Sequence, residues 1–386
     1  MSTAGPVLFG LALLAGLAPR AHAADVPPAD ALVAAIARAG NAFAFELYAR
    51  LRGKEKGNLF CSPQSIATAL AMTSLGARGE TETQMARTLH LSMPQAELPA
   101  AYAAFLATLR ATKDQPWELS VANRLWGQRG ADFLAPFLQS VRTGFDAELG
   151  RVDFAAQPDA ARQEINQWVQ GETRGKIQNL LAQGTVTPLT RLVLTNAIYF
   201  RADWAEQFDR KVTSDQSFSL PGGAARKVPL MFRKVKATYA ELPDAVDGRG
   251  ALEGQLTAER LDGWIAGATR RDVLVYLPRF TVDSRFGLAD TLAAMGMPSA
   301  FGEGADFSGM NGKRDLSVSA VVHAARVEVD ERGTEAAAAT GVAVGLTSAL
   351  PQEPPVFRAD HPFVFLIRDT RTGLVLFLGR VTDPTK

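Results

Sequence analysis

The spacing of apolar residues along the chain predicts a mixture of helices and strands. Apolar side chains recur at helical intervals in four segments: 31–51, 102–109, 160–171 and 286–297. Alternation or short apolar runs predict strands at 117–126, 273–280, 316–329, 363–367 and 374–378. One further run, Arg191–Phe200, is apolar almost throughout, which is typical of a central strand covered on both faces. These segments predict an α+β protein.

The stretch that follows the strand 316–329 has almost no side-chain bulk. With a period of two, the even positions from Thr334 to Val344 are small or β-branched, and the odd positions are small or charged. This pattern suits a strand that slides between two existing strands, where a large or charged inward residue would be buried without a partner. Helix propensity favours a second interpretation, an alanine-rich surface helix capped by Thr334.

Two motifs near the carboxyl end connect this stretch to a known family. Val329–Ala339, with the sequence VDERGTEAAAA, resembles the reactive-loop hinge of the serpins, and Phe357–Phe365 resembles the strand pair that follows the loop. On these motifs the chain is identified as a bacterial, secreted serpin of the inhibitory type. The resemblance covers residues 30–383. It implies the serpin fold for 24–386: one α+β domain with a large mixed main sheet, smaller sheets and eight or nine helices.

The resemblance implies that the protein inhibits a serine protease, or a cysteine protease, as a suicide substrate. The protease cleaves an exposed reactive loop, here about residues 331–356, and forms an acyl-enzyme before the freed segment inserts into the main sheet. The family's spacing from Gly333 places the cleaved bond at Thr347–Ser348, with Leu346 and Leu350 as neighbouring alternatives. No Arg or Lys lies between 333 and 357, which favours an elastase-, chymotrypsin- or subtilisin-like target over a trypsin-like one.

The resemblance also implies roles around the main sheet. The hinge residues are Glu331, Gly333, Thr334, Glu335, Ala336, Ala337, Ala338 and Ala339. The shutter, where the strands separate, contains Ser62, Ser65, Asn196 and His323, and Trp204 marks the breach where the loop first enters. From the residues alone, Ser62 is a helix cap before Pro63 and His323 is a satisfied core histidine, and both interpretations are compatible with a shutter.

The sequence departs from the family after Ala240. A serpin normally continues here through two long apolar strands of its small barrel-like sheet, but in this chain Glu241 leads directly into Leu242 and Pro243. The loss of these strands removes part of an apolar core. It predicts either that the segments 233–241 and 242–256 rearrange to cover the core, or that the protein is unstable or inactive as an inhibitor.

Composition narrows the range of partners. The net charge is +1, with 41 basic and 40 acidic residues well mixed, so we expect no nucleic-acid partner. The region 86–115 lacks a basic cluster, so we expect no sulfated-polysaccharide site. Cys61 is the only cysteine and no metal-binding motif is present, so we expect no cofactor and no metal. We expect a monomer.

The amino-terminal residues resemble a signal peptide. Val7–Ala18 is an apolar core, and Ala21, His22 and Ala23 form a small-x-small cleavage pattern. The apolar run is too short to span a bilayer as a stable helix. We therefore expect residues 1–23 to be removed, and the mature protein to be secreted or periplasmic without a membrane anchor.

Two other functions remain open. A non-inhibitory serpin acts as a carrier, chaperone or decoy substrate, but such members tend to carry bulky or charged hinge residues. A secreted hydrolase would need Ser308 or Ser62 as the nucleophile and His323 as the base. Neither serine lies in a nucleophile elbow, so we expect that the protein is not an enzyme.

Overall fold

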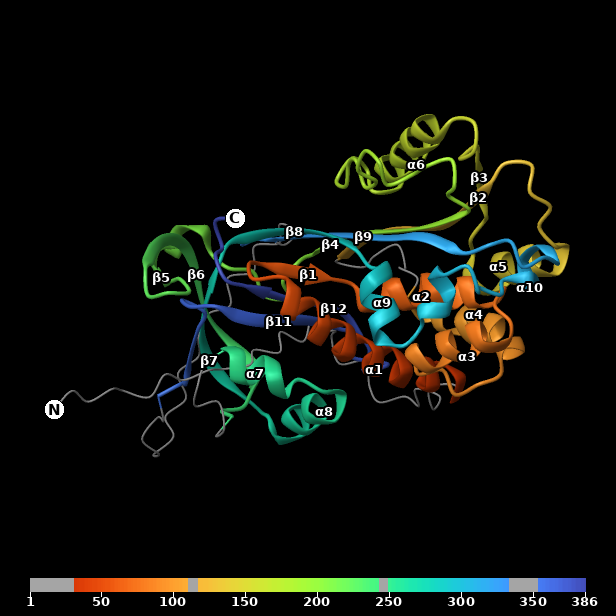
Figure 1. Cartoon of the computed structure of the whole chain (residues 1–386). Helices are drawn as coiled ribbons and strands as arrows, with labels where there is room; N and C mark the ends of the chain where they lie inside the picture. Colours follow the sequence, from red (N-terminus) through yellow and green to blue (C-terminus); the bar gives the residue numbers. More distant parts are fainter. Residues whose placement is uncertain (1–30, 110–116, 243–248, 333–352) are drawn as a thin grey trace.

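The computed structural model describes residues 31–109, 117–242, 249–332 and 353–386. These residues form ten α-helices and three β-sheets (Figure 1). The helices are α1 (Ala31–Lys54), α2 (Pro63–Ser74), α3 (Gly79–Thr88), α4 (Leu98–Leu109), α5 (Ala135–Phe145), α6 (Pro158–Glu172), α7 (Arg249–Gln255), α8 (Ala258–Gly267), α9 (Ala289–Met295) and α10 (Ser308–Asn311). The expected α+β class is confirmed. The helices of the described part outnumber the eight or nine expected because short segments such as the four-residue α10 are also helical.

The main sheet has five strands in the order β3-β2-β4-β9-β8. Their bounds are β2 (Trp117–Gln128), β3 (Gly150–Val152), β4 (Leu192–Ala202), β8 (Phe280–Gly287) and β9 (Val318–Val329). The sheet is mixed, as expected, because β4 and β9 are parallel whereas β2 pairs antiparallel with β4, and β8 with β9. The predicted strands 191–200 and 316–329 therefore lie side by side at its centre.

Two smaller sheets complete the fold. A four-stranded sheet has the order β10-β7-β6-β5, and a three-stranded sheet has the order β1-β12-β11. The strands of the first are β5 (Ser214–Ser219), β6 (Ala225–Tyr239), β7 (Thr269–Pro278) and β10 (Val356–Arg358). Those of the second are β1 (Leu59–Cys61), β11 (Phe363–Arg368) and β12 (Val375–Val381).

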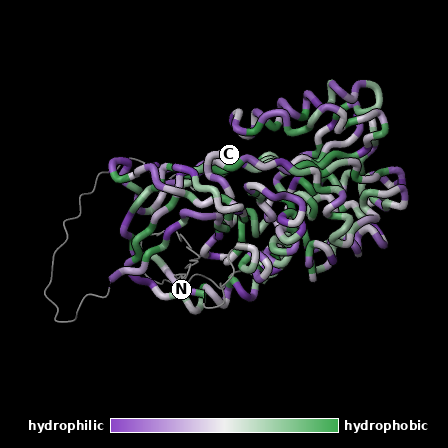
Figure 2. The backbone as a smooth tube through the Cα atoms, turned by 60° about the vertical axis from the view of Figure 1, so that its left-hand side comes forward, coloured by the Kyte–Doolittle hydropathy of each residue, from purple (hydrophilic) through white to green (hydrophobic). Residues whose placement is uncertain are grey.

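The main sheet separates two unequal layers of helices (Figure 1). Helix α6 alone covers one face, where Ile165 and Val169 pack with Trp126, Val193 and neighbouring apolar residues. Most of the other helices lie on the opposite face, together with the three-stranded sheet, and enclose the largest apolar core. Hydrophobic backbone positions concentrate in the strands, whereas α6 is largely hydrophilic (Figure 2), as expected for a helix with one apolar face.

The described residues on either side of the departure after Ala240 belong to β6 and lead into α7 (Arg249–Gln255). β6 remains paired with β7 along its whole carboxyl-terminal half, from Leu230 opposite Pro278 to Tyr239 opposite Thr269. The residues after it include α7, which lies against β11. From α7, the buried Glu253 accepts a hydrogen bond from Tyr48 at 2.6 Å and lies 3.2 Å from the buried Arg380 guanidinium. A helix with a buried ion pair therefore lies beside the outer strand of the three-stranded sheet.

The predicted strands 363–367 and 374–378 form the carboxyl-terminal hairpin β11–β12, and its two strands differ in burial. Val375, Phe377 and Leu378 of β12 are fully buried. Phe363, Phe365 and Ile367 of β11 remain half-buried in the interior between the sheets. The strand next to the departure from the family is thus the less covered of the two.

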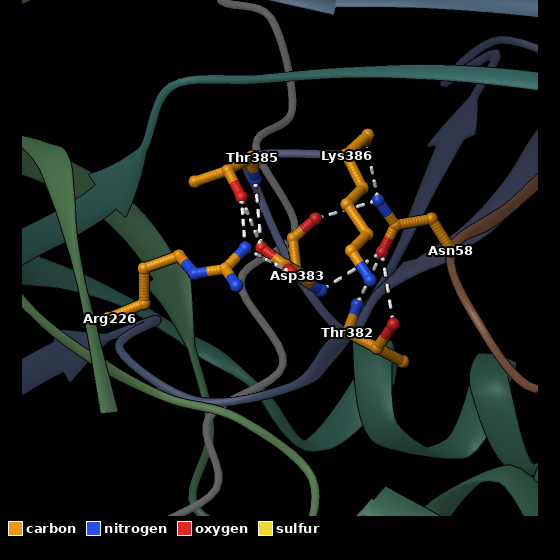
Figure 3. Close-up of polar contacts among 6 residues, drawn as sticks. All are labelled: Asn58, Arg226, Thr382, Asp383, Thr385 and Lys386. Carbon is orange, nitrogen blue, oxygen red and sulfur yellow. Dashed lines mark hydrogen bonds and ion pairs between the residues drawn. The ribbon is translucent and has the colours of Figure 1, made fainter. Parts of the chain in front are cut away.

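The last residues of the chain are tied to the start of β1 and of β6 (Figure 3). The Asn58 carboxamide accepts hydrogen bonds from the Thr382 and Asp383 amides at 2.8 and 3.0 Å, and donates to the carbonyls of Asp383 and Lys386. Arg226 donates to the Asp383 carboxylate at 2.7 Å. Because one asparagine joins four backbone groups, the end of β12 is held in place despite its position at the terminus.

Candidate functional site

The parallel pair β4–β9 forms a seam at the centre of the main sheet. Its ladder runs from Leu192 opposite Val318 to Phe200 opposite Val327, with Asn196 directly opposite His323. β9 ends at Val329, four residues before Gly333, and β10 begins at Val356 in a different sheet. The segment that the sequence singles out therefore connects the seam to the edge of the four-stranded sheet.

Two buried polar residues, Asn196 and His323, bridge this seam. Both Asn196 and His323 have no solvent exposure. The His323 Nδ1–H donates to the Asn196 side-chain oxygen, and His323 Nε2 accepts a hydrogen bond from the Ser62 amide at 3.2 Å. These partners fix the neutral tautomer with the proton on Nδ1. Burial lowers the pKa of His323 to about 3, despite the opposing effect of Asn196, so the ring is neutral at physiological pH.

The network continues into β2 and α2. The Asn196 amide donates to Ser65 Oγ at 2.7 Å and to Asn123 Oδ1 at 2.5 Å, and Ser65 Oγ donates to Asn123 Oδ1 at 3.0 Å. Asn123 was not predicted as a site residue. It lies directly opposite Asn196 on β2, a relation that depends on strand register and that no local sequence pattern indicates.

Ser62 serves both as a helix cap and as a part of this network. Its Oγ accepts a hydrogen bond from the Ser65 amide at 3.2 Å and donates to the Leu376 carbonyl of β12 at 2.8 Å. Pro63 begins α2, as the sequence predicts, and every residue of this helix is buried. The four predicted shutter residues, Ser62, Ser65, Asn196 and His323, are thus brought together by α2, β4 and β9, with Asn123 added from β2.

The top of the seam is held by contacts around the end of β9. The Trp204 indole N–H donates to the Asp330 carbonyl at 2.8 Å, and its ring packs edge-on against Phe208 at 5.5 Å. The next residue, Glu331, is 2 % exposed, and its carboxylate accepts hydrogen bonds from Arg279 Nε at 2.6 Å and Thr213 Oγ1 at 2.5 Å. Burial raises the pKa of this carboxyl, but the hydrogen bonds from Arg279 and Thr213 outweigh it and hold the pKa below its ordinary value.

A lysine spans the same seam from its α6 side. Lys176, which follows α6, places its ammonium 4.9 Å from the centroid of the Tyr199 ring on β4 and 3.6 Å from the Glu328 carboxylate on β9. Glu328 also pairs with Arg326 at 2.9 Å, and Arg326 with Asp283 of β8 at 2.8 Å. Opening the seam between β4 and β9 therefore requires Lys176 to give up one of its two contacts.

Comparison with known proteins agrees with this architecture. The model of the family described as Serpin (serine protease inhibitor) matches residues 38–242 and 237–384. The chain belongs to the serpin family. The two matched parts of this serpin meet at residues 237–242, which is where the sequence departs from the family pattern.

The chain is similar over almost its whole length to curated serpins. It is 38% identical over 371 residues to the leukocyte elastase inhibitor of Xenopus laevis, covering 89% of this chain and 97% of that protein. It is 39% identical over 379 residues to the leukocyte elastase inhibitor of Bos taurus, covering 90% and 99%. The family and these relatives support serine protease inhibition. Both relatives are vertebrate proteins, so the bacterial source expected from the sequence gains no support.

Solved serpin structures share the fold. Human thyroxine-binding globulin in complex with its ligand aligns with a TM-score of 0.80 at 30% identity, covering 92% of this chain and 100% of that one. Mouse protein-Z dependent protease inhibitor aligns with a TM-score of 0.79 at 27% identity, covering 92% and 98%. The fold is thus similar to that of a thyroxine-binding globulin and of a protease inhibitor.

Several predicted site residues lie outside the described part of this serpin. They are the hinge residues Gly333, Thr334, Glu335, Ala336, Ala337, Ala338 and Ala339, and the residues around the predicted bond, Leu346, Thr347, Ser348 and Leu350. The signal segment 1–23 lies outside it as well. Within the described ranges, no helix is long and apolar enough to cross a membrane, and no group of three His, Cys, Asp or Glu side chains is placed to hold a metal ion.

Proposed function

We propose that this serpin is an exported suicide inhibitor of serine proteases with elastase-, chymotrypsin- or subtilisin-like specificity. The observation that carries the proposal is the closed seam beside the hinge. β4 and β9 pair directly along the centre of a five-stranded sheet, and β9 continues within four residues into Gly333 and a segment without bulky side chains. A sheet in this form can accept one more strand between β4 and β9.

Energetics favour insertion of that strand. About a dozen new ladder hydrogen bonds contribute ~1 kcal/mol each. Burial of Val342 and Val344 adds ~1.5–3 kcal/mol for each side chain. The sum exceeds the ~5–15 kcal/mol by which an ordinary domain is stable, so insertion is favourable enough to carry along an acyl-enzyme attached to the moving strand.

We also propose that the protein is not an enzyme. Both ring nitrogens of His323 are engaged, by Asn196 and by the Ser62 amide, and the Ser62 hydroxyl donates to the Leu376 carbonyl. Neither group is arranged as a nucleophile and its base. The absence of exposure of His323 also keeps substrates away from it.

The test is incubation of the mature protein with pancreatic and neutrophil elastase, chymotrypsin, subtilisin and trypsin. We expect a complex that survives SDS and boiling with one of the first four, and mass spectrometry of the released peptide should place cleavage at Thr347–Ser348. Clean cleavage without a complex across the panel would instead support a carrier, chaperone or decoy, or an inhibitor disabled by the change after Ala240. The mature protein recovered after export should begin at Ala24.

A further inference from the structure

A cavity lies between the outer edge of the main sheet and the end of the chain. Its volume is about 520 Å³, which falls within the ~300–1,000 Å³ of ligand pockets. Its walls are the first residues of β8, the turn between β5 and β6, Gly57 and Asn58 before β1, and the last residues of the chain. None of these residues belongs to the shutter or the breach. The cavity is therefore separate from the groups that the proposed function uses.

β8 is the outermost strand of the main sheet, and none of the described strands pairs with its outer edge. Its pairing with β9 shows which backbone groups face that edge. The Leu288 amide donates to the Val321 carbonyl at 2.9 Å, and residues 280–287 hold the same antiparallel register without a shift. Hydrogen-bonded and non-hydrogen-bonded positions alternate in such a ladder, so the N–H and C=O groups of Thr281 and Asp283 point away from β9.

These outward backbone groups lie in the wall of the cavity. Thr281 and Asp283 both line it, and their outward N–H and C=O groups have no hydrogen-bond partner among the described residues. Two donors and two acceptors are thus placed two residues apart along one wall. An extended peptide presents its own N–H and C=O groups with the same two-residue period, and it adds to a free sheet edge as a further strand.

Another wall of the cavity carries a positive charge on an anchored segment. Asn58 donates to the Lys386 carbonyl at 2.9 Å, and Arg226 pairs with Asp383 at 2.7 Å (Figure 3). The Lys386 side chain is exposed, and its ammonium has no ion-pair partner among the described residues. Because Asp383 is already paired with Arg226, a ligand gains by presenting a carboxylate to Lys386.

We propose that this cavity binds a short extended segment of another protein, which adds to the main sheet beside β8 and carries an acidic residue between apolar ones. Thr281 and Asp283 bind the peptide backbone, and Lys386 binds the carboxylate. Leu220 and Pro221, at the turn between β5 and β6, contact the apolar side chains. The inference does not depend on the proposed function, because the site uses neither the hinge nor the seam between β4 and β9.

The test measures the binding of a fluorescent probe to the mature protein by polarisation. The probe is a five-residue peptide with blocked ends and the sequence Thr-Leu-Glu-Leu-Thr. Gly57→Phe fills the cavity, because open space surrounds the position of a Cβ atom at Gly57. Gly53→Phe is the matched control, since Gly53 has the same open space but lies in the last turn of α1, outside the cavity. We expect binding to weaken more than about tenfold in Gly57→Phe and to stay unchanged in Gly53→Phe.

A second pair of variants tests the charge. Lys386→Ser should bind the glutamate probe about three- to tenfold more weakly, but it should bind a probe with glutamine in place of glutamate as the unmodified protein does. Lys313→Ser is the control. Lys313 is an exposed lysine that follows α10, which lies at the opposite end of the molecule from the chain terminus (Figure 1). Equal effects of the two lysine variants would contradict the role of Lys386.

Two further probes carry N-methyl groups on alternate amides. Only one of the two sets of amides faces β8 in an added strand, so methylation of that set should abolish binding and methylation of the other should preserve it. Equal effects of both sets, or no binding of any probe at ~1 mM, would overturn the proposal. Equal binding to Gly57→Phe and to the unmodified protein would overturn it too, and would indicate entry between β4 and β9 instead. A dimer found by sedimentation without any probe, and absent in Gly57→Phe, would make a second copy of the chain the occupant and overturn the choice of partner.

Discussion

Arg279 and Glu331 form an ion pair across the top of the main sheet in which the acid is 1% exposed and the base 38%. The pair joins the residue just after β7 to Glu331, the first of the predicted hinge residues, so it fixes the start of the predicted reactive loop. Because the Glu331 side chain is buried, solvent does not readily replace the hydrogen bonds from Arg279 and Thr213 if the hinge moves. The pair therefore opposes premature separation of the loop from the sheet.

Glu331→Gln should weaken this anchor. Loss of the charge from a buried, hydrogen-bonded position leaves Arg279 without its partner, and we expect the free energy of unfolding to fall by about 1–3 kcal/mol. We also expect polymers on mild heating, because an unanchored loop can enter the sheet of another molecule. Calorimetry and native gels measure both effects. Arg332→Gln is the matched control, since that side chain is 60% exposed and lies 3.9 Å from Asp330. Equal behaviour of the two variants would show that the pair does not anchor the loop.

Thr334→Arg and Ala336→Asp should each convert the inhibitor into a substrate. Both place a charge on the face of the hinge that enters the sheet, which costs several kcal/mol when no partner is present. The protease then completes hydrolysis before insertion traps it. Glu335→Gln, on the opposite face, is the control and should retain complex formation. Full complex yield in either charged variant would show that the inserting face has been assigned wrongly.

Stability should depend on pH through His323. The pKa of His323 is about 3 in the folded protein and ~6.5 in the unfolded chain, so below pH 6.5 the unfolded chain binds a proton that the folded protein does not. The stabilisation present above pH 6.5 is lost progressively as the pH falls toward 3. From pH 6.5 to 5 we expect a loss of roughly 1.5 kcal/mol. Denaturant titrations at several pH values test this.

A His323→Gln variant separates this effect from general acid sensitivity. It should be less stable at neutral pH by ~1–3 kcal/mol, because a buried partner is left unsatisfied, but it should lack the added slope below pH 6.5. His90→Gln on the surface serves as the control and should keep the slope of the unmodified protein. An identical slope in all three proteins would show that groups other than His323 cause the dependence of stability on pH.

Sequence periodicity predicted the three long central strands of the main sheet, β2, β4 and β9, but it predicted neither β3 nor β8. Trp117–Trp126 extends only to Gln128, and the strand predicted to start at 316 begins at Val318. Boundaries were less accurate where two elements join. The helix predicted at 286–297 is shorter, because Phe286 and Gly287 still pair with β9 and α9 begins at Ala289.

The site could be predicted only as far as the family resemblance names single residues. Ser62, Ser65, Asn196 and His323 carry a recognisable motif or an unusual polar side chain within an apolar run. Asn123, Arg279 and Lys176 do not, since their roles depend on strand register and on chain segments far apart in the sequence. Arg279 meets Glu331 across 52 positions, a proximity that no local pattern encodes.

Lys176→Met should ease opening of the seam. The lysine contacts Tyr199 on β4 and Glu328 on β9, so its loss removes a cation–π contact worth ~0.5–1 kcal/mol and a partly exposed ion pair of similar size. A synthetic peptide with the sequence of residues 334–347 should then insert about three- to tenfold faster, as followed by tryptophan fluorescence. Arg174→Met is the control, because Arg174 pairs with Glu118 on β2 and does not span the seam. Equal insertion rates would show that Lys176 does not contribute to the barrier that opposes peptide insertion.

The departure from the family pattern after Ala240 should have a measurable effect on the native protein. Half-buried Phe363, Phe365 and Ile367 predict that the native monomer binds a hydrophobic dye and melts below typical serpins. Glu253→Ala should lower the stability further, by ~3–5 kcal/mol, because it leaves the 3% exposed Arg380 without its acid. A sharp high-temperature transition, no dye binding and full inhibition would show that α7 closes the core completely.

The parallel direction of β4 and β9 decides how far an attached enzyme would travel. A chain that leaves the end of β9 and turns back at Gly333 runs opposite to both strands, so one slanted ladder is exchanged for two antiparallel ones. Fourteen residues, Thr334 to Thr347, extend for about 45 Å at ~3.3 Å each. The paired seam has only nine matched positions, from Leu192 to Phe200. The acyl bond would therefore pass beyond the start of β4 and emerge at the opposite pole of the molecule, where the bulk of the protease is pressed against the serpin body.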